Sequence, residues 1–142
     1  MSTTRELHRA VYEAVPDRDF ERLREIYHPD CSYTGGDGVE HRGVAAVLAV
    51  VETFTTAFPD LAIEIRHQHL PSQSVSIVEY VFAGTHRGDL EGIPPTGRRM
   101  EVVACSVVEV REGRIGWERD YYDTLALMEQ LGVAGNRLDG NP

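Results

Sequence analysis

Three carboxylates lie within six positions near the C-terminal end of the chain, in the stretch IGWERDYYDTLALMEQLG at residues 115–132. They are Glu118, Asp120 and Asp123. A carboxyl group whose pKa is raised toward neutrality by burial can both remove a proton and return one. Such a group could act as a general acid/base without a metal. The chemistry therefore depends on which carboxylate is buried.

Period-two alternation in a strand at 113–122 places Glu118, Asp120 and Tyr122 on one face. The opposite face carries Ile115, Trp117, Arg119 and Tyr121. That second face is the more apolar, so alternation by itself predicts that the carboxylate face is solvated. Asp123 follows the strand and precedes a helix that ends at Gly132, which predicts a helix N-cap.

Histidines offer further candidate groups. His86 ends a strand before the loop GDLEGIPPTG, where it could orient Asp120, bond a substrate carbonyl or tie down the loop. The loop itself is either a lid or a tight connection. His67 and His69 project from one strand face without a third ligand, so we expect a solvated face or an interface and no metal site.

The elements that position these groups follow from periodicity and turn residues. Helices are predicted over 3–15, 20–27, 43–58 and 123–132. Strands are predicted over 31–34, 61–70, 74–86, 98–110 and 113–122. Helices segregated from an antiparallel meander predict an α+β fold, with a curved antiparallel sheet wrapped round the long helix and an open, apolar mouth.

Composition narrows the function. The 142 residues fit a single domain over 1–142, with a core at about 5–132 and a tail at 133–142. A net charge of −9 disfavours nucleic acid and anionic membranes, so neither is expected as a partner. No segment resembles a signal peptide or a transmembrane helix. Cys31 and Cys105 form no CxxC motif and are expected to be reduced in a cytoplasmic protein.

Several segments resemble the SnoaL-like polyketide cyclases. They are IYHPDCSY (26–33), AFPDL (57–61), GTHRGDLEGIPPTGRRM (84–100) and GRIGWERDYYDTLALMEQLG (113–132). The resemblance runs from about Arg5 to Gly132. It implies a cone-shaped α+β barrel of the ketosteroid-isomerase type and a homo-oligomer, a dimer or tetramer, built through the sheets. It also implies cofactor-independent chemistry on a small hydrophobic or aromatic carbonyl compound.

The resemblance also assigns candidate residues. In that family the general acid/base is the first aspartate of a basic-Asp-aromatic-x-Asp run, which here is Asp120. An assisting histidine one strand earlier is replaced by Ser106 in an ungapped alignment, so the specific ring-closing activity is an open point. The family's G-x-His-x-G step is kept around His86. These matches make Asp120 and His86 the catalytic candidates.

Aromatic residues could line a pocket for a flat ligand. We expect about half of them to pack in the hydrophobic core instead. The substrate-binding candidates are Glu118, Tyr122, Tyr33, Phe54, Phe58, Tyr80, Phe82, Ser106 and Trp117, with Tyr27 as a further aromatic residue.

Four functions are compatible with this sequence. The first is a cyclase or isomerase that uses Asp120, and the second is a hydroxylase acting on a polycyclic substrate, as in relatives of the same family. The third is a small-molecule binding or assembly module. The fourth is an epoxide hydrolase, because GWERDYYD resembles the last strand of the limonene epoxide hydrolases. That mechanism needs an arginine and an aspartate where this chain has Tyr80 and Phe82, so it ranks lowest.

Overall fold

The computed structural model describes residues 2–133. In chain order its elements are α1 (Thr4–Ala14), α2 (Phe20–Ile26), β1 (Tyr27–Thr34), β2 (Glu40–Arg42), α3 (Val44–Ala57), β3 (Ala62–His69), β4 (Val75–Thr85), β5 (Arg99–Arg111), β6 (Arg114–Tyr122) and α4 (Thr124–Gln130). The predicted α+β class and four helices are confirmed within this part of the chain. The predicted tail at 133–142 lies, apart from Val133, outside the described residues.

The strands form one sheet in the order β2-β1-β6-β5-β4-β3. Strands β3 to β6 form the predicted antiparallel meander. Strand β1 adds a parallel pairing with β6, so the predicted antiparallel sheet is extended into a mixed one. Parallel neighbours need a long connection, and here all the intervening elements lie between these two strands in sequence. The connection between β1 and β6 is therefore long enough for the two strands to pair in either direction.

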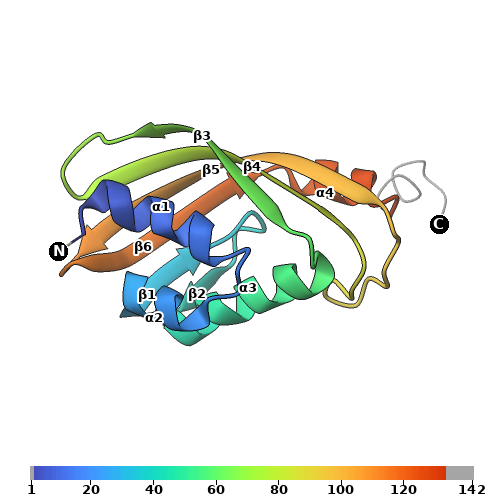
Figure 1. The fold of residues 1–142 in the computed structure, drawn as a ribbon, viewed down its shortest axis with the longest axis horizontal. Helices are drawn as coiled ribbons and strands as arrows, with labels where there is room; N and C mark the ends of the chain where they lie inside the picture. The colour runs from blue at the N-terminus through green and yellow to red at the C-terminus, as the bar shows by residue number, and fades with distance from the viewer. Residues whose placement is uncertain (1, 134–142) are drawn as a thin grey trace.

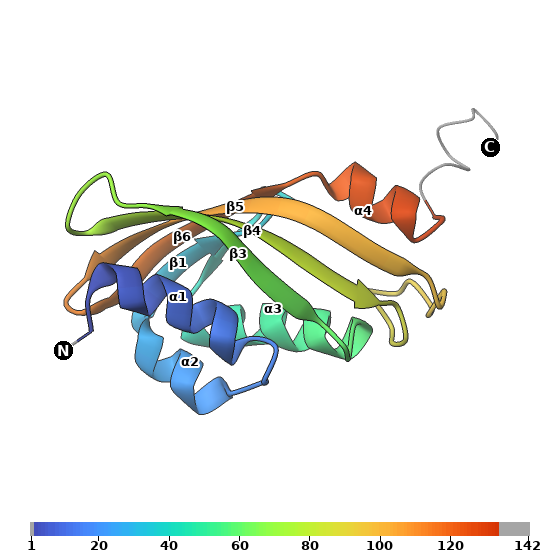
Figure 2. The same cartoon turned by 45° about the horizontal axis from the view of Figure 1, so that its top comes forward.

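Helices α1, α2 and α3 lie against the concave side of the arched sheet, and α4 lies beyond the end of β6, against β5 (Figures 1 and 2). Thr3 caps α1 through a capping box with Glu6, as its spacing predicts. The apolar helix α3 forms one wall of the core through Val47, Leu48 and Val51. The concave side is therefore enclosed between a sheet and helices that come from the first half of the chain.

Strand β1 begins earlier than predicted, at Tyr27, and β2 was missed altogether. Pro29 lies where the pairing between β1 and β6 is interrupted, between Tyr27 and Ser32. A proline is tolerated in a strand at such an irregularity, since it has no N–H to donate to a ladder. The HPD stretch that suggested a break therefore lies within the strand.

A bulge in β6 decides which side chains face the core. Glu109 pairs with Trp117 whereas Val110 pairs with Ile115, so Gly116 is an extra residue on β6. The extra residue turns Ile115 inward together with Glu118 and Asp120. The structure thus buries the carboxylate face and corrects the prediction that it is solvated.

None of the helices described over residues 2–133 has the length and apolar character needed to cross a membrane.

Candidate active site

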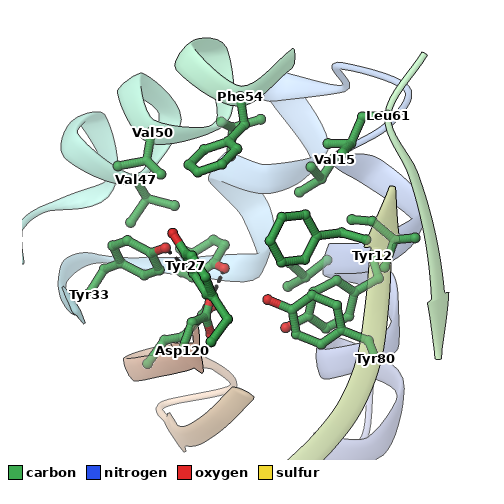
Figure 3. A pocket seen from close by; sticks show the side chains of 16 residues that line it. Tyr12, Val15, Tyr27, Tyr33, Val47, Val50, Phe54, Leu61, Tyr80 and Asp120 are labelled. Atoms are coloured by element: carbon green, nitrogen blue, oxygen red, sulfur yellow. Dashed lines mark hydrogen bonds between the residues drawn. The ribbon is translucent and has the colours of Figure 1, made fainter. Parts of the chain in front are cut away.

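A cavity of about 90 Å³ lies between the concave face of the sheet and helices α1 and α3. Its walls are mainly apolar and aromatic, with Phe54 and Val50 from α3 on one side and Tyr12 from α1 on another (Figure 3). Glu118 and Asp120 of β6 lie in its lining, and a group of tyrosines surrounds them. The only carboxylates in the lining are therefore held in an apolar chamber.

Asp120 is 8% exposed. The Tyr33 hydroxyl lies 3.4 Å from Oδ2 and donates to it, while Oδ1 has no hydrogen-bond partner among residues 2–133. Burial raises the pKa of Asp120, and the polar groups of Glu118, Ser106 and Tyr33 oppose that rise. Asp120 therefore combines a raised pKa with a free oxygen, which are the properties that a general acid/base needs.

Glu118 lies next to Asp120 on the same strand face and is 2% exposed. The Tyr27 hydroxyl donates to its Oε1 at 2.5 Å. Burial, followed by the charge of Asp120, raises the pKa of Glu118 well above its ordinary value. Two carboxylates so close cannot both ionise at low cost, so the pair keeps one proton to a higher pH than isolated carboxyl groups do. We assign that proton to Glu118, because burial and the charge of Asp120 both raise its pKa, whereas burial alone raises that of Asp120.

Four buried tyrosines surround the carboxyl pair. Burial, together with the nearby carboxylates, raises the pKa values of Tyr12, Tyr27, Tyr33 and Tyr80 well above the ordinary value. Each phenol therefore stays neutral and keeps its hydrogen. Figure 3 shows Tyr27 and Tyr33 on one side of Asp120 and Tyr12 and Tyr80 on the other. The chamber thus presents hydroxyl donors around the carboxyl pair.

A second and larger cavity, of about 480 Å³, adjoins the first. It lies between α3, α4 and the loops around Gly36 and Leu90. Its lining shares four side chains with the inner cavity, namely Tyr33, Val50, Phe54 and Tyr122. Burial raises the pKa of Tyr122 to about 12. The inner chamber has room for one end of a molecule, and the outer cavity has the size usual for the body of a small-molecule ligand.

Most of the aromatic residues singled out from the sequence line the inner cavity. They are Tyr27, Tyr33, Phe54, Tyr80, Phe82 and Tyr122. Phe58 is instead fully buried and packs on His86, with ring centroids 5.5 Å apart. Trp117 lies on the other side of the sheet, where the Arg119 guanidinium stacks 3.9 Å from its ring. These two aromatic side chains are outside the cavity lining.

His86 is fully buried in the loop that follows β4, and it does not line either cavity. The backbone N–H of Thr96 donates to its Nδ1 at 3.2 Å. Gly88 packs so closely on α3 that an added Cβ would lie 2.1 Å from the Thr56 carbonyl oxygen. The contacts of His86 fit the loop-holding alternative. Leu90, from the same loop, walls the outer cavity.

The remaining sequence candidates lie in the core, at a helix cap and at the surface. Ser106 is fully buried and pairs with Asp120 across β5 and β6. Asp123 accepts a bond from a first-turn N–H of α4, which confirms the predicted N-cap. His67 and His69 stack on each other at the surface. Across residues 2–133, no three His, Cys, Asp or Glu side chains are grouped to hold a metal ion.

Sequence reasoning missed three polar groups of this region, namely His8, Tyr12 and Ser76, all of which are buried. The signal was present for two of them. His8 and Tyr12 are four residues apart and adjoin the apolar stripe of α1, so they share its buried face. Ser76 shows no comparable signal, because a serine in an alternating strand is as common on either face.

The arched sheet over helices and its buried carboxyl pair define an α+β protein with a ketosteroid-isomerase-like fold and an enclosed acidic site. The chain belongs to the SnoaL-like polyketide cyclase family, whose profile matches residues 5–131. It is 29% identical over 136 residues to the aklanonic acid methyl ester cyclase DnrD of Streptomyces peucetius, covering 93% of this chain and 92% of that protein.

Solved structures agree with this assignment. IdmH from Streptomyces antibioticus, a candidate polyketide cyclase, superposes with a TM-score of 0.80 at 28% identity, over 93% of this chain and 100% of that one. A Catenulispora acidiphila protein with a ketosteroid-isomerase-like fold superposes with a TM-score of 0.76 at 16% identity, over 90% and 93% of the two chains. The second likeness concerns the fold alone.

Proposed function

We propose that this protein is a cofactor-independent cyclase that closes a ring by an aldol-type reaction, with Asp120 as general acid/base. The observation that carries the proposal is the free Oδ1 of a buried carboxyl in an apolar chamber. The relative DnrD is named as the cyclase of a methyl ester, which supports an ester-bearing carbonyl compound as the substrate class. The inner chamber would take the reacting carbons, and the outer cavity would take the remaining rings.

The reaction would proceed in two proton transfers at one carboxyl group. Asp120 removes a proton from a carbon flanked by carbonyls, and the enolate attacks a second carbonyl to form the carbon–carbon bond. The protonated Asp120 then returns the proton to the new alkoxide, so the enzyme ends as it began. Neutral Glu118 partly opposes the rise that burial causes in the pKa of Asp120, and so keeps Asp120 ionised before the first proton transfer.

The test is turnover of a polycyclic ketoester by Asp120→Asn, with product identified by mass spectrometry. The substitution keeps the size of the side chain and removes the base, so a loss of about 10²- to 10⁴-fold in rate is expected. Glu109→Gln is the matched control, since Glu109 is an exposed carboxylate on the neighbouring strand. Wild-type rates in Asp120→Asn would remove Asp120 from this role.

The same assay separates the other functions. A product that gains one oxygen atom would indicate the hydroxylase, whereas tight binding without any product would indicate the binding module. Tyr80 and Phe82 lie in the cavity wall, where epoxide hydrolysis would need an arginine and an aspartate. The composition of the wall therefore supports the cyclase over the epoxide hydrolase.

A further inference from the structure

A second buried histidine lies behind the carboxyl pair. His8, on α1, is fully buried between serines of two different strands. Its Nδ1 lies 2.7 Å from the Ser76 Oγ on β4, and its Nε2 lies 3.1 Å from the Ser106 Oγ on β5. Burial lowers the pKa of His8 to about 3, so the ring is neutral and carries a single N–H. Which nitrogen holds that hydrogen decides what each serine does.

The contacts of Gln68, at the surface end of this hydrogen-bond network, determine which group donates and which accepts at Ser76. Arg9 Nη1 donates to Gln68 Oε1 at 3.2 Å, which identifies the amide oxygen of Gln68. The amide nitrogen of Gln68 then donates to the Arg5 carbonyl oxygen at 3.2 Å and to the Ser76 Oγ at 3.0 Å. Ser76 therefore accepts a bond from Gln68, and its own hydroxyl hydrogen remains to be donated.

That hydrogen determines the tautomer of His8. Among the contacts of the Ser76 Oγ with residues 2–133, only His8 Nδ1 can accept that hydrogen, which makes Nδ1 the acceptor and leaves the ring hydrogen on Nε2. Nε2–H then donates to the Ser106 Oγ. A serine oxygen that accepts this bond still has its own hydrogen, which must point elsewhere.

Asp120 is the carboxylate in register with Ser106 across the sheet, and the protonated Glu118 leaves it as the charged acceptor there. The two residues are cross-strand partners on β5 and β6, and both are buried on the concave side. Burial raises the pKa of both Asp120 and Glu118, and the Ser106 hydroxyl opposes that rise in each carboxyl group. The other titratable groups that face Asp120 in the chamber are Glu118 and the tyrosines Tyr12, Tyr27, Tyr33, Tyr80 and Tyr122.

We propose that His8 is a positioning residue, whose Nε2–H turns the Ser106 hydroxyl toward Asp120 and so holds the charged form of that carboxylate in place. Its importance for catalysis rests on the proposed function of Asp120. The hydrogen-bond relay runs from the surface amide of Gln68 through Ser76, His8 and Ser106. It links α1, β4 and β5 to the reacting group on β6.

The first test is the tautomer of His8 in the wild-type protein, measured by ¹⁵N NMR of the imidazole nitrogens near pH 7 without substrate. A hydrogen on Nε2, with Nδ1 unprotonated, is the expected result. A hydrogen on Nδ1, or a doubly protonated ring, would reverse the relay and overturn the proposal. This measurement needs no variant, so it does not depend on how well a substitution at a buried site folds.

The second test follows the titration of Asp120 by ¹³C NMR of its side-chain carboxyl group, again without substrate. Ser106→Ala and His8→Leu should each shift the titration midpoint of Asp120 upward, because the first removes the hydroxyl and the second no longer orients it toward Asp120. The double variant should show no further shift beyond Ser106→Ala. A midpoint in His8→Leu equal to that of wild type, or additive shifts in the double variant, would refute the relay.

His86→Leu is the matched control, since His86 is equally buried but lies in the loop after β4. Its Asp120 titration should coincide with that of wild type, and a shift as large as in His8→Leu would show that any buried histidine has this effect. Both tests run without turnover, so they can fail independently of the cyclase proposal. Full activity in Asp120→Asn with an intact relay would instead refute the cyclase alone.

Discussion

Replacing Glu118 by glutamine should change how the stability of the protein depends on pH. Burial and the neighbouring Asp120 raise the pKa of Glu118 well above its ordinary value of 4.5. The folded protein therefore keeps a proton that the unfolded chain releases once the pH exceeds about 4.5. The stabilisation from this proton is complete below the unfolded pKa and is lost as the pH rises through the folded pKa.

The size of the pH effect on the free energy of unfolding follows from the one additional proton that the folded protein binds. Within that window, each pH unit lowers the free energy of unfolding of the wild type by about 1.4 kcal/mol. Glu118→Gln has no proton to lose at this position, and its amide oxygen still offers Tyr27 an acceptor. Over two pH units inside the window, the variant should gain about 2.7 kcal/mol relative to wild type. That is a large share of the roughly 5–15 kcal/mol typical of a domain.

The assay is urea unfolding from pH 5.5 to 8.5, followed by the fluorescence of Trp117, the only tryptophan of the chain. Glu109→Gln, at an exposed site, is the control and should follow the wild-type curve at every pH. Parallel curves for wild type and Glu118→Gln would show that Glu118 is ionised in the folded protein. The assignment of the retained proton would then be wrong.

Three further changes test other parts of the structure. Asp123→Ala removes the cap of α4 and should lower the free energy of unfolding by about 1 kcal/mol in urea titrations; an unchanged value would exclude the cap. Gly88→Ala forces a Cβ against the Thr56 carbonyl and should cost at least about 1–3 kcal/mol, so a stable variant would contradict the close packing of the loop on α3. Val103 is 72% exposed on the convex face, so Val103→Glu should convert a sheet-built oligomer into monomers in light scattering. A monomeric wild type would refute the predicted assembly.

The sequence predicted the elements of this fold well where the signal is local. The capping box at Thr3, the apolar stretch of α3 and the alternating meander each act over a few residues, and each appears in the structure. The errors occur where pairing partners are remote. The start of β1, its parallel pairing with β6 and the short strand β2 depend on neighbours that local periodicity does not specify.

The same contrast between local signals and remote contacts applies to the candidate site. By itself, the sequence grouped Glu118, Asp120 and Tyr122 on one strand face, because side chains alternate along any strand. Only the tertiary structure decided that this face is the inner one, since a carboxyl group becomes buried through the helices that cover it and through a bulge at Gly116. His8 shows this most clearly: it contacts Ser106 across 98 residues of sequence, a distance over which no local pattern operates.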